Sequence, residues 1–586
     1  MASFTTRPVI MGTHGVVAAG HYLAAQAGLQ MLELGGNAID AGVAMGFALA
    51  ALKPHANGIG GEAPILVYSA DMGRAFAVNG QGVAPRAATI ERYKEMGIDL
   101  IPGDGFLPAV VPAMVDTYVT ALAAFGTMPL AEVMAPALEL AGDGFPMYEG
   151  LRAAIESNLP RWEERYPSSA ETFAPGGRVH ELGEVFAQPH WAAALGLLVE
   201  AERKAARRGR TAALRAARDV FYRGDMAREI VGFARKTELV DASGRAHAAL
   251  LTEDDFADYS ARVERPIAVD YRGLTVHKCS TWCQGGVFLQ QLNLLEGFDL
   301  PAMGHNSTEY IHTLIECAKL AFADRNAYYG DPDFVEVSLD RLLSKEYAEE
   351  RRELVDRNRA SLEDRPGAGI SPQRRERPAR EGGGEAPWPT MHGGDTTKCD
   401  AVDRFGNMIS ITPSGGWFMS SPAIPGLGFA LGTRGQMFEL DPAHPNCLAP
   451  KKRPRATLTP SLVTNDGEPW MVFGTPGGDC QDQWTLQFFL NYVDFEMDLQ
   501  EAIDVPTFHS EHFRNSFYPR AEKPGHMVVE GRIAEEVRRE LEARGHIVNV
   551  TEEWANGQVE GIRFDRETGL ICGAASPRGA SYAMGW

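Results

Sequence analysis

The chain has 586 residues and a formal net charge of −21 at pH 7, with 45% hydrophobic and 23% charged residues. This length allows about two to four domains and a large core that needs no metal or disulfide. The acidic balance argues against nucleic acid or an anionic membrane as a partner. The seven cysteines are sparse and irregularly spaced. We therefore expect a reducing, cytoplasmic location and no disulfide framework.

The start of the chain, MASFTTRPVIMGTHG, has no apolar segment of the kind that a secretory signal needs. The longest run of small apolar residues, Ala38 to Leu52, carries Asp40 and is short for a membrane span. It predicts a buried helix in a protein without membrane association.

The first part of the chain alternates helix and strand signals. Helical spacing over Tyr22 to Leu34 ends at a Gly-Gly pair, and Asn37 can cap a second helix that runs to Leu52. Two strand-like runs, Pro64 to Tyr68 and Ala75 to Val78, flank an Asp-Met-Gly turn and predict a hairpin.

Residues 108–343 have a mainly helical pattern. An exception is Val263 to Val276, which predicts strand with a turn at Asp270. The clearest helical pieces are Val111 to Phe125, Leu130 to Ala141, Trp191 to Ala217 and Ser307 to Tyr329.

Residues 361–394 are rich in Gly, Pro, Arg and Glu and poor in aliphatic residues. Such a stretch buries too little apolar surface to offset the entropy of ordering it. We therefore predict a disordered, exposed linker. Strand pairs are predicted directly after it, around turns at 403–407 and 465–469, and a helix is predicted over 483–492.

The segment GGDTTKCDAVDRFGN, residues 393–407, joins the end of this linker to a Thr-Thr pair that opens a strand. A threonine hydroxyl is a poor nucleophile unless a base lies beside it. An N-terminal threonine supplies that base from its own α-amine, whose pKa of about 7.7–8.0 is close to working pH. Thr396 becomes such a residue only if the bond to Asp395 is broken. The alternative is an ordinary polar start of a strand.

Two further segments could complete a site. In GTPGGDCQDQW, residues 474–484, a strand enters a glycine turn whose backbone N–H groups could meet a developing oxyanion. The alternative is a plain strand-to-helix turn. In KKRPRATLTPSL, residues 451–462, Thr457 has no specific signal of its own. Cys279 and Cys283 have no second pair of cysteines or histidines nearby in the sequence, which a zinc site would need. Cys283 and Cys480 are predicted to be buried thiols.

These segments together resemble the γ-glutamyltransferase (glutathione hydrolase) family of N-terminal-nucleophile hydrolases. Colinear matches run from LELGGNAIDAGVAMGFALAALKP through FGTMPLAEVMAPALELAGDGF, AKLAFADRNAYYGDPDF and the Thr-Thr segment to the terminal ASPRGASYAMGW. The resemblance implies an α+β fold, a four-layer αββα sandwich. It also implies a proenzyme cut into a large subunit, 1–395, and a small catalytic subunit, 396–586, that form one intertwined domain. Pairing of such assemblies into a homo-oligomer is left open.

The resemblance also implies roles for individual residues. Thr396 would be the nucleophile and its freed amine the base, with cleavage between Asp395 and Thr396. Ser414 would support the nucleophile, and Gly477 and Gly478 would form the oxyanion hole. Substrate-contacting positions are Thr457, Arg434 and Gln81. No metal or other cofactor is implied.

The departures from the family pattern concern the glutamyl group. Gln81 stands where true γ-glutamyl enzymes carry an arginine for the α-carboxylate, and Met437 stands where they carry an acid for the α-amine. Two charge-assisted contacts of about 1.5–3 kcal/mol each are thus missing, on the order of 10²–10⁴ in affinity. Arg434 adds a positive charge, for which we expect no acidic partner. The alternative is a solvated loop arginine.

We therefore predict a self-cleaving amidohydrolase that acts on a small non-glutamyl amide, oxamate-like or another acyl amide, through an acyl-enzyme. This pattern is similar to the divergent oxamate amidohydrolase and acylase branch of the family. One alternative is a γ-glutamyltransferase or glutathione hydrolase with replacement contacts. Another is an inactive, uncleaved relative that acts as a binding or scaffold protein.

Overall fold

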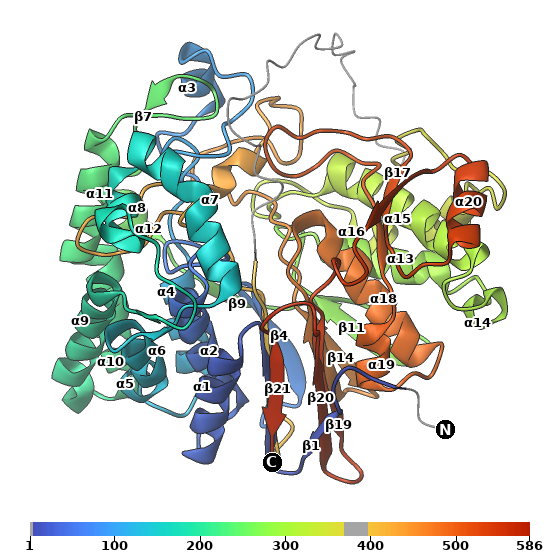
Figure 1. The fold of residues 1–586 in the computed structure, drawn as a ribbon, viewed down its shortest axis with the longest axis horizontal. Helices are drawn as coiled ribbons and strands as arrows, with labels where there is room; N and C mark the ends of the chain where they lie inside the picture. Colours follow the sequence, from blue (N-terminus) through green and yellow to red (C-terminus); the bar gives the residue numbers. More distant parts are fainter. Residues whose placement is uncertain (1–3, 368–395) are drawn as a thin grey trace.

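The structure, a computed structural model, describes residues 4–367 and 396–586 (Figure 1). Asp395 and residues 368–394 of the predicted linker therefore lie outside the described residues. The first part of that linker is described, and Gly367 N donates to Asp324 Oδ1 at 2.8 Å. The described part of this segment is therefore hydrogen-bonded to the rest of the protein up to Gly367.

Two antiparallel sheets of seven strands each form the centre of the described protein. Sheet A has the order β1 (Ile10–Gly12), β20 (Leu570–Ala575), β19 (Glu560–Asp565), β15 (Glu468–Gly474), β14 (Ser461–Asn465), β11 (Leu274–Lys278), β10 (Ile267–Tyr271). Sheet B has the order β21 (Tyr582–Gly585), β2 (Gly15–Ala19), β12 (Cys399–Asp403), β13 (Met408–Ile411), β3 (Ile65–Ser69), β4 (Arg74–Asn79), β9 (Arg262–Glu264).

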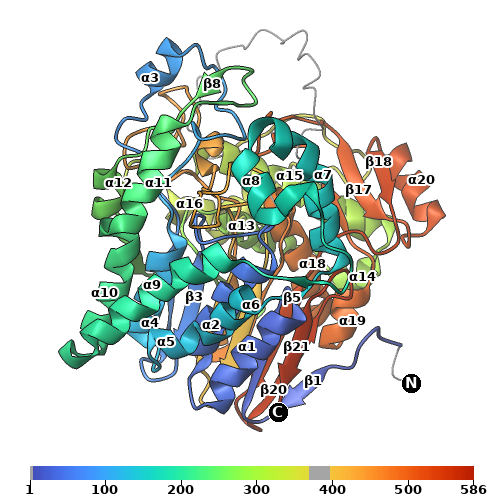
Figure 2. The ribbon, with the colours of Figure 1, turned by 60° about the vertical axis from the view of Figure 1, so that its left-hand side comes forward.

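The two sheets face each other, with helices on both outer sides (Figures 1 and 2). Helices α1 (Tyr22–Glu33), α2 (Ala38–Leu52) and α4 (Met114–Phe125) cover sheet B. Helices α13 (Gly286–Leu295), α18 (Gln481–Val493) and α19 (Leu499–Asp504) cover sheet A. The predicted four-layer αββα sandwich is confirmed.

The sheets pack through a shared apolar interior. Val16, Leu66 and Met408 from sheet B meet Leu462 and Ile562 from sheet A in one cluster of buried side chains. Each of these strands also faces helices on its other side. Burial on both faces fits the nearly continuous apolar runs of β2, GVVAA, and β3, ILVYS.

Helix α2 shows how local sequence sets the architecture. Asn37 Oδ1 accepts from Ile39 N and Asp40 N, and Asp40 Oδ2 accepts from Asn37 N at 3.0 Å, which is a capping box. All fifteen helix residues are buried, because α2 packs between sheet B and the outer helices. Its reading as a buried helix is confirmed, and within the described residues no helix is long and apolar enough to cross a bilayer.

Two segments that were each predicted as one continuous helix are interrupted in the structure, so these two predictions were wrong. The piece Trp191 to Ala217 is two helices, α9 (Pro189–Ala205) and α10 (Arg210–Arg223), which pack against each other. Gly209, with φ of 91°, reverses the chain between them. The piece Leu130 to Ala141 is likewise divided at Met134 into α5 (Leu130–Val133) and α6 (Ala135–Gly142).

Candidate active site

Thr396 lies just before β12, the strand held between β2 and β13 near the middle of sheet B. Its side chain is buried, and its Oγ1 lies 3.0 Å from Ser414 Oγ. Thr396 and Ser414 also form an isolated antiparallel β-bridge beyond the end of the β12–β13 ladder. The backbone itself therefore holds the two hydroxyls together.

Ser414 is held from two further sides. Its N–H donates to Glu62 O at 2.9 Å, and Arg434 Nη2 donates to its Oγ at 2.6 Å. A hydroxyl that accepts from a guanidinium can still give its own proton to a neighbour. Ser414 can thus donate to Thr396 Oγ1 and stabilise negative charge that develops there.

Arg434 is fully buried, and its Nε forms an ion pair with Glu62. The guanidinium carbon also lies 4.8 Å from the centre of the Trp417 ring and 5.5 Å from that of Phe517. Burial raises the pKa of Glu62, and the charge of Arg434 opposes that rise. The expectation that Arg434 has no acidic partner was therefore wrong.

Glu62 is the functional residue that sequence reasoning missed. It is buried in the loop before β3, and no motif marks it. It is separated from Arg434 by 372 positions, so no local spacing connects the two. The one available signal was an acidic residue directly after Gly60-Gly61, where an unpaired buried carboxylate would be costly.

Gly477 and Gly478 follow β15 and precede α18, with φ of 130° and 54°. A Cβ on Gly477 would come within 2.3 Å of the Trp484 ring, so the turn requires glycine there. Among the described residues, neither glycine N–H has a hydrogen-bond acceptor. Two free N–H groups at one turn are suited to an oxyanion.

This glycine turn lies next to the threonine. Lys398, two residues after Thr396, packs its side chain against Gly474 at the end of β15. Phe517 contacts the position of Gly478 and also flanks the Arg434 guanidinium. The structure thus brings Thr396, Ser414, Arg434 and the glycine turn into one region.

Gln81 approaches this region on a segment of its own, and Thr457 lies on another segment. Gln81 follows β4, and Gly80 beside it packs on Ala63, the residue after Glu62. Thr457 lies in the extended chain before β14. The side chains of both residues are buried, and among the described residues the Gln81 Oε1 and Nε2 and the Thr457 Oγ1 have no hydrogen-bond partner.

Arg434 Nη1 and Glu62 Oε2 are also buried and have no hydrogen-bond partner within residues 4–367 and 396–586. Buried polar atoms almost always have hydrogen-bond partners in native proteins. Gln81, Glu62 and Arg434 lie on segments that meet near Thr396, and their unsatisfied atoms favour a polar ligand at this place.

The thiols considered in the sequence do not compete as nucleophiles. Burial raises the pKa of both Cys283 and Cys480 well above the ordinary value for a thiol. The thiolate is the reactive form, so both groups are kept in an unreactive state.

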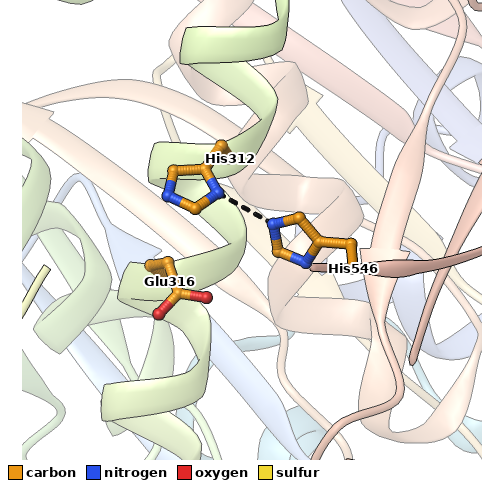
Figure 3. Close-up of side chains that lie close together, drawn as sticks. All are labelled: His312, Glu316 and His546. Atoms are coloured by element: carbon orange, nitrogen blue, oxygen red, sulfur yellow. Dashed lines mark hydrogen bonds between the residues drawn. The ribbon is translucent and has the colours of Figure 1, made fainter. Parts of the chain in front are cut away.

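One group of side chains has the composition of a metal site. His312 and Glu316 on α15 (Thr308–Tyr328) lie beside His546 (Figure 3). However, Glu316 Oε1 already accepts from Lys319 at 2.6 Å, and its Oε2 accepts from Arg365 at 3.1 Å. The two histidines are hydrogen-bonded to each other at 2.8 Å. With two cations on the carboxylate, this group fits a structural network and does not fit a cation site.

Ser414 provides a prediction about the nucleophile. Ser414→Ala should slow cleavage of the precursor by about 10–100-fold, because the hydroxyl that can stabilise charge on Thr396 is lost. The readout is the appearance of two bands on a denaturing gel over time. Ser421→Ala is the control, since it removes a buried serine hydroxyl bonded to Leu431 O, away from Thr396. Cleavage at the wild-type rate in Ser414→Ala would refute a supporting role.

Comparison with known proteins identifies the family. The gamma-glutamyltranspeptidase family model matches residues 24–586. The chain belongs to this family. A Bacillus subtilis (strain 168) relative, the glutathione hydrolase-like YwrD proenzyme, is 32% identical over 98% of this chain and 99% of its own. The acylase ACY 1 proenzyme of Pseudomonas sp. (strain SE83) is 33% identical over 96% of this chain and 92% of its own.

Solved structures agree with this assignment over the full length. LmbA2991HD is 44% identical, with a TM-score of 0.92 and complete coverage of both chains. The cephalosporin acylase from Bacillus halodurans is 31% identical, with a TM-score of 0.84, and covers 100% of this chain and 98% of its own. The chain is therefore an enzyme of the N-terminal-nucleophile hydrolase type, with both acylases and glutathione hydrolases among its relatives.

Proposed function

We propose that this protein is a self-cleaving N-terminal-threonine amidohydrolase that acts on a small amide whose acyl group is not glutamyl. The observation that carries the proposal is the 3.0 Å contact between Thr396 Oγ1 and Ser414 Oγ beside two glycine N–H groups that have no acceptor among the described residues. A nucleophile, a supporting hydroxyl and oxyanion donors are the groups that acyl transfer requires.

In the precursor, Thr396 Oγ1 attacks the carbonyl carbon of Asp395, and the acyl group moves from nitrogen to oxygen. This shift breaks the C–N bond and frees the Thr396 α-amine. Water then hydrolyses the ester, which frees the Thr396 hydroxyl and leaves Asp395 with the new C-terminal carboxylate. Relatives named as proenzymes support such a maturation. In the mature enzyme the amine takes the hydroxyl proton while Oγ1 attacks the substrate amide. The protonated amine product leaves, and water hydrolyses the acyl-enzyme.

The proposed preference for a non-glutamyl acyl group rests on uncharged residues at the positions where γ-glutamyl enzymes carry charged ones. Gln81 is uncharged, and Met437 is 1% exposed. Arg434 and Glu62 form an ion pair and together have no net charge. Among the described residues, Arg434 Nη1 is left as one unused donor and Glu62 Oε2 as one unused acceptor. An oxamate-like amide, with acceptor oxygens and an N–H donor close together, matches this pair.

A second candidate, a γ-glutamyl enzyme, is favoured by one observation. Glu62 Oε2 is buried, has no partner among the described residues and could accept from a substrate α-amine, while Arg434 Nη1 could donate to the α-carboxylate. These would be the replacement contacts that the sequence does not reveal. The missing arginine at Gln81 and acid at Met437 weigh against this candidate.

The choice is tested with the cleaved enzyme and a panel of small amides, with release of ammonia or amine as the readout. We expect oxamate-like amides to be hydrolysed and γ-glutamyl-p-nitroanilide to be turned over on the order of 10²-fold more slowly or worse. Efficient turnover of γ-glutamyl-p-nitroanilide would overturn the proposed specificity in favour of the second candidate.

A further inference from the structure

A small polar cavity adjoins the candidate active site and has no part in the mechanism above. It has a volume of about 30 Å³, which is room for a group of only a few atoms. Among the residues that line it are Met437, Glu439, Arg455, Arg514, Ser516 and Arg520. Three of these side chains are cationic and one is acidic.

Arg455 is the residue that points to a ligand. It is only 7% exposed, and its Nη2 donates to Ser516 Oγ at 3.2 Å. Its Nη1 is buried and has no hydrogen-bond partner in the part of the chain that the structure describes. A buried charged donor without an acceptor is costly, and an acceptor placed in the cavity would remove that cost.

The charges around the cavity leave an excess of positive charge. Glu439 accepts from Arg514 Nη1 at 2.9 Å and also pairs with Arg520. Asp479 pairs with Arg325, so the two acids whose charges act on Arg455, Asp479 and Glu439, are each already paired with another arginine. Burial, together with the charges of Arg325 and Arg520, holds the pKa of Arg455 well below its usual range.

His444, which also lines the cavity, does not change this balance. Burial lowers its pKa to about 4, so it is neutral at pH 7. An anion is therefore the kind of group that would satisfy both the free donor and the excess charge.

The cavity is connected to the active site by two routes. Met437 belongs to its wall and packs with Trp417 and Phe517, whose rings flank Arg434. Ser516 Oγ and N donate to Asp479, the residue after Gly478, at 2.6 and 2.7 Å. A ligand held by Arg455 would thus lie close to the reacting groups.

We propose that this cavity binds a small carboxylate, with Arg455 Nη1 as the donor that holds it. A planar guanidinium matches a carboxylate in shape as well as in charge. The carboxylate is either a free small anion or one that is part of the substrate. Binding itself does not depend on the proposed catalysis, whereas the substrate source rests on the proposed function.

The test is a titration of the purified protein with sodium formate at constant ionic strength, with sodium chloride as the reference salt. We expect a saturable rise in the thermal unfolding midpoint that chloride does not give. In Arg455→Met the apparent affinity for formate should fall about tenfold or more, since a charge-assisted contact is lost. A wild-type protein that formate does not stabilise, or equal affinity in both proteins, would overturn the proposal.

Arg453→Met is a matched control, because Arg453 is two positions away and pairs with Asp331 and Asp333 outside the cavity. It should keep the wild-type response to formate. If Arg455→Met fails to fold, Arg455→Lys is the second variant. It keeps the positive charge but loses the planar guanidinium, so formate should stabilise it less than the wild type. No change in Arg455→Lys would then contradict the proposal.

The source of the carboxylate is read from kinetics. If formate raises KM for the amide substrate and leaves kcat unchanged, the carboxylate belongs to the substrate. If formate stabilises the protein without changing KM, the site takes a free anion. Lack of amide hydrolysis with intact formate binding would overturn the proposed function and leave this site standing.

Discussion

Thr396→Ala will give one uncut chain of 63.7 kDa and no measurable amide hydrolysis, a loss on the order of 10⁴-fold or more. The methyl group that replaces the hydroxyl cannot attack the bond to Asp395. The α-amine therefore stays inside a peptide bond and has no basicity. The readouts are a denaturing gel and amine release.

Two matched variants separate this effect from loss of folding. Thr396→Ser keeps a hydroxyl at the same place and should still be cleaved. Thr397→Ala changes the next residue, which is equally buried and whose Oγ1 has no hydrogen-bond partner. It should be cleaved as the wild type is. Two bands from Thr396→Ala, at the same position as in the wild type, would mean that another group cuts the chain.

Arg434→Ala will destabilise the protein by about 3–5 kcal/mol, because it leaves the buried Glu62 carboxylate without its ion-pair partner. The measurement is urea unfolding in a Thr396→Ala background, where the chain remains in one piece and the transition is simpler to interpret. A change below about 1 kcal/mol, the range of exposed ion pairs, would contradict the buried pair.

The effect of Arg434→Ala will depend on pH. Burial raises the pKa of Glu62, and removal of Arg434 takes away the charge that opposes this rise. A carboxyl whose pKa is higher in the folded than in the unfolded state contributes stability at low pH. That stability is lost as pH rises through the folded pKa. The variant should therefore be closer to wild type near pH 5 than near pH 8.

The double variant Arg434→Met with Glu62→Met separates stability from catalysis. Replacement of both charges by apolar groups should restore much of the stability lost in the single variant. Chain cleavage should still be slow when Thr396 is present, because Ser414 no longer accepts from Arg434 Nη2. Fast cleavage in the double variant would mean that Arg434 has only a structural role.

Local sequence predicted much of the fold. Asn37 was expected to cap a helix, and it forms the capping box of α2. The turn at 403–407 joins β12 to β13 as expected. The break at Gly209 was missed because the helical pattern on both sides of it is continuous. No local signal gives the order of strands in sheet B, where β12 pairs with β2 from the other end of the chain.

The candidate site was predictable to the extent that its residues belong to recognisable segments. Thr396, Ser414 and the glycine turn were each singled out, and they lie in one region. The Glu62–Arg434 pair was not predictable, because contact between distant positions is a property of the folded chain. That pair replaces an expected positive site by a neutral one.

The central claim is that the chain is severed before residue 396. It is tested most directly by intact-mass spectrometry and N-terminal sequencing of the purified, active wild-type protein. We expect two polypeptides, and the smaller one should begin at Thr396 and comprise residues 396–586. Active protein that consists of one unbroken chain of 586 residues would contradict the account.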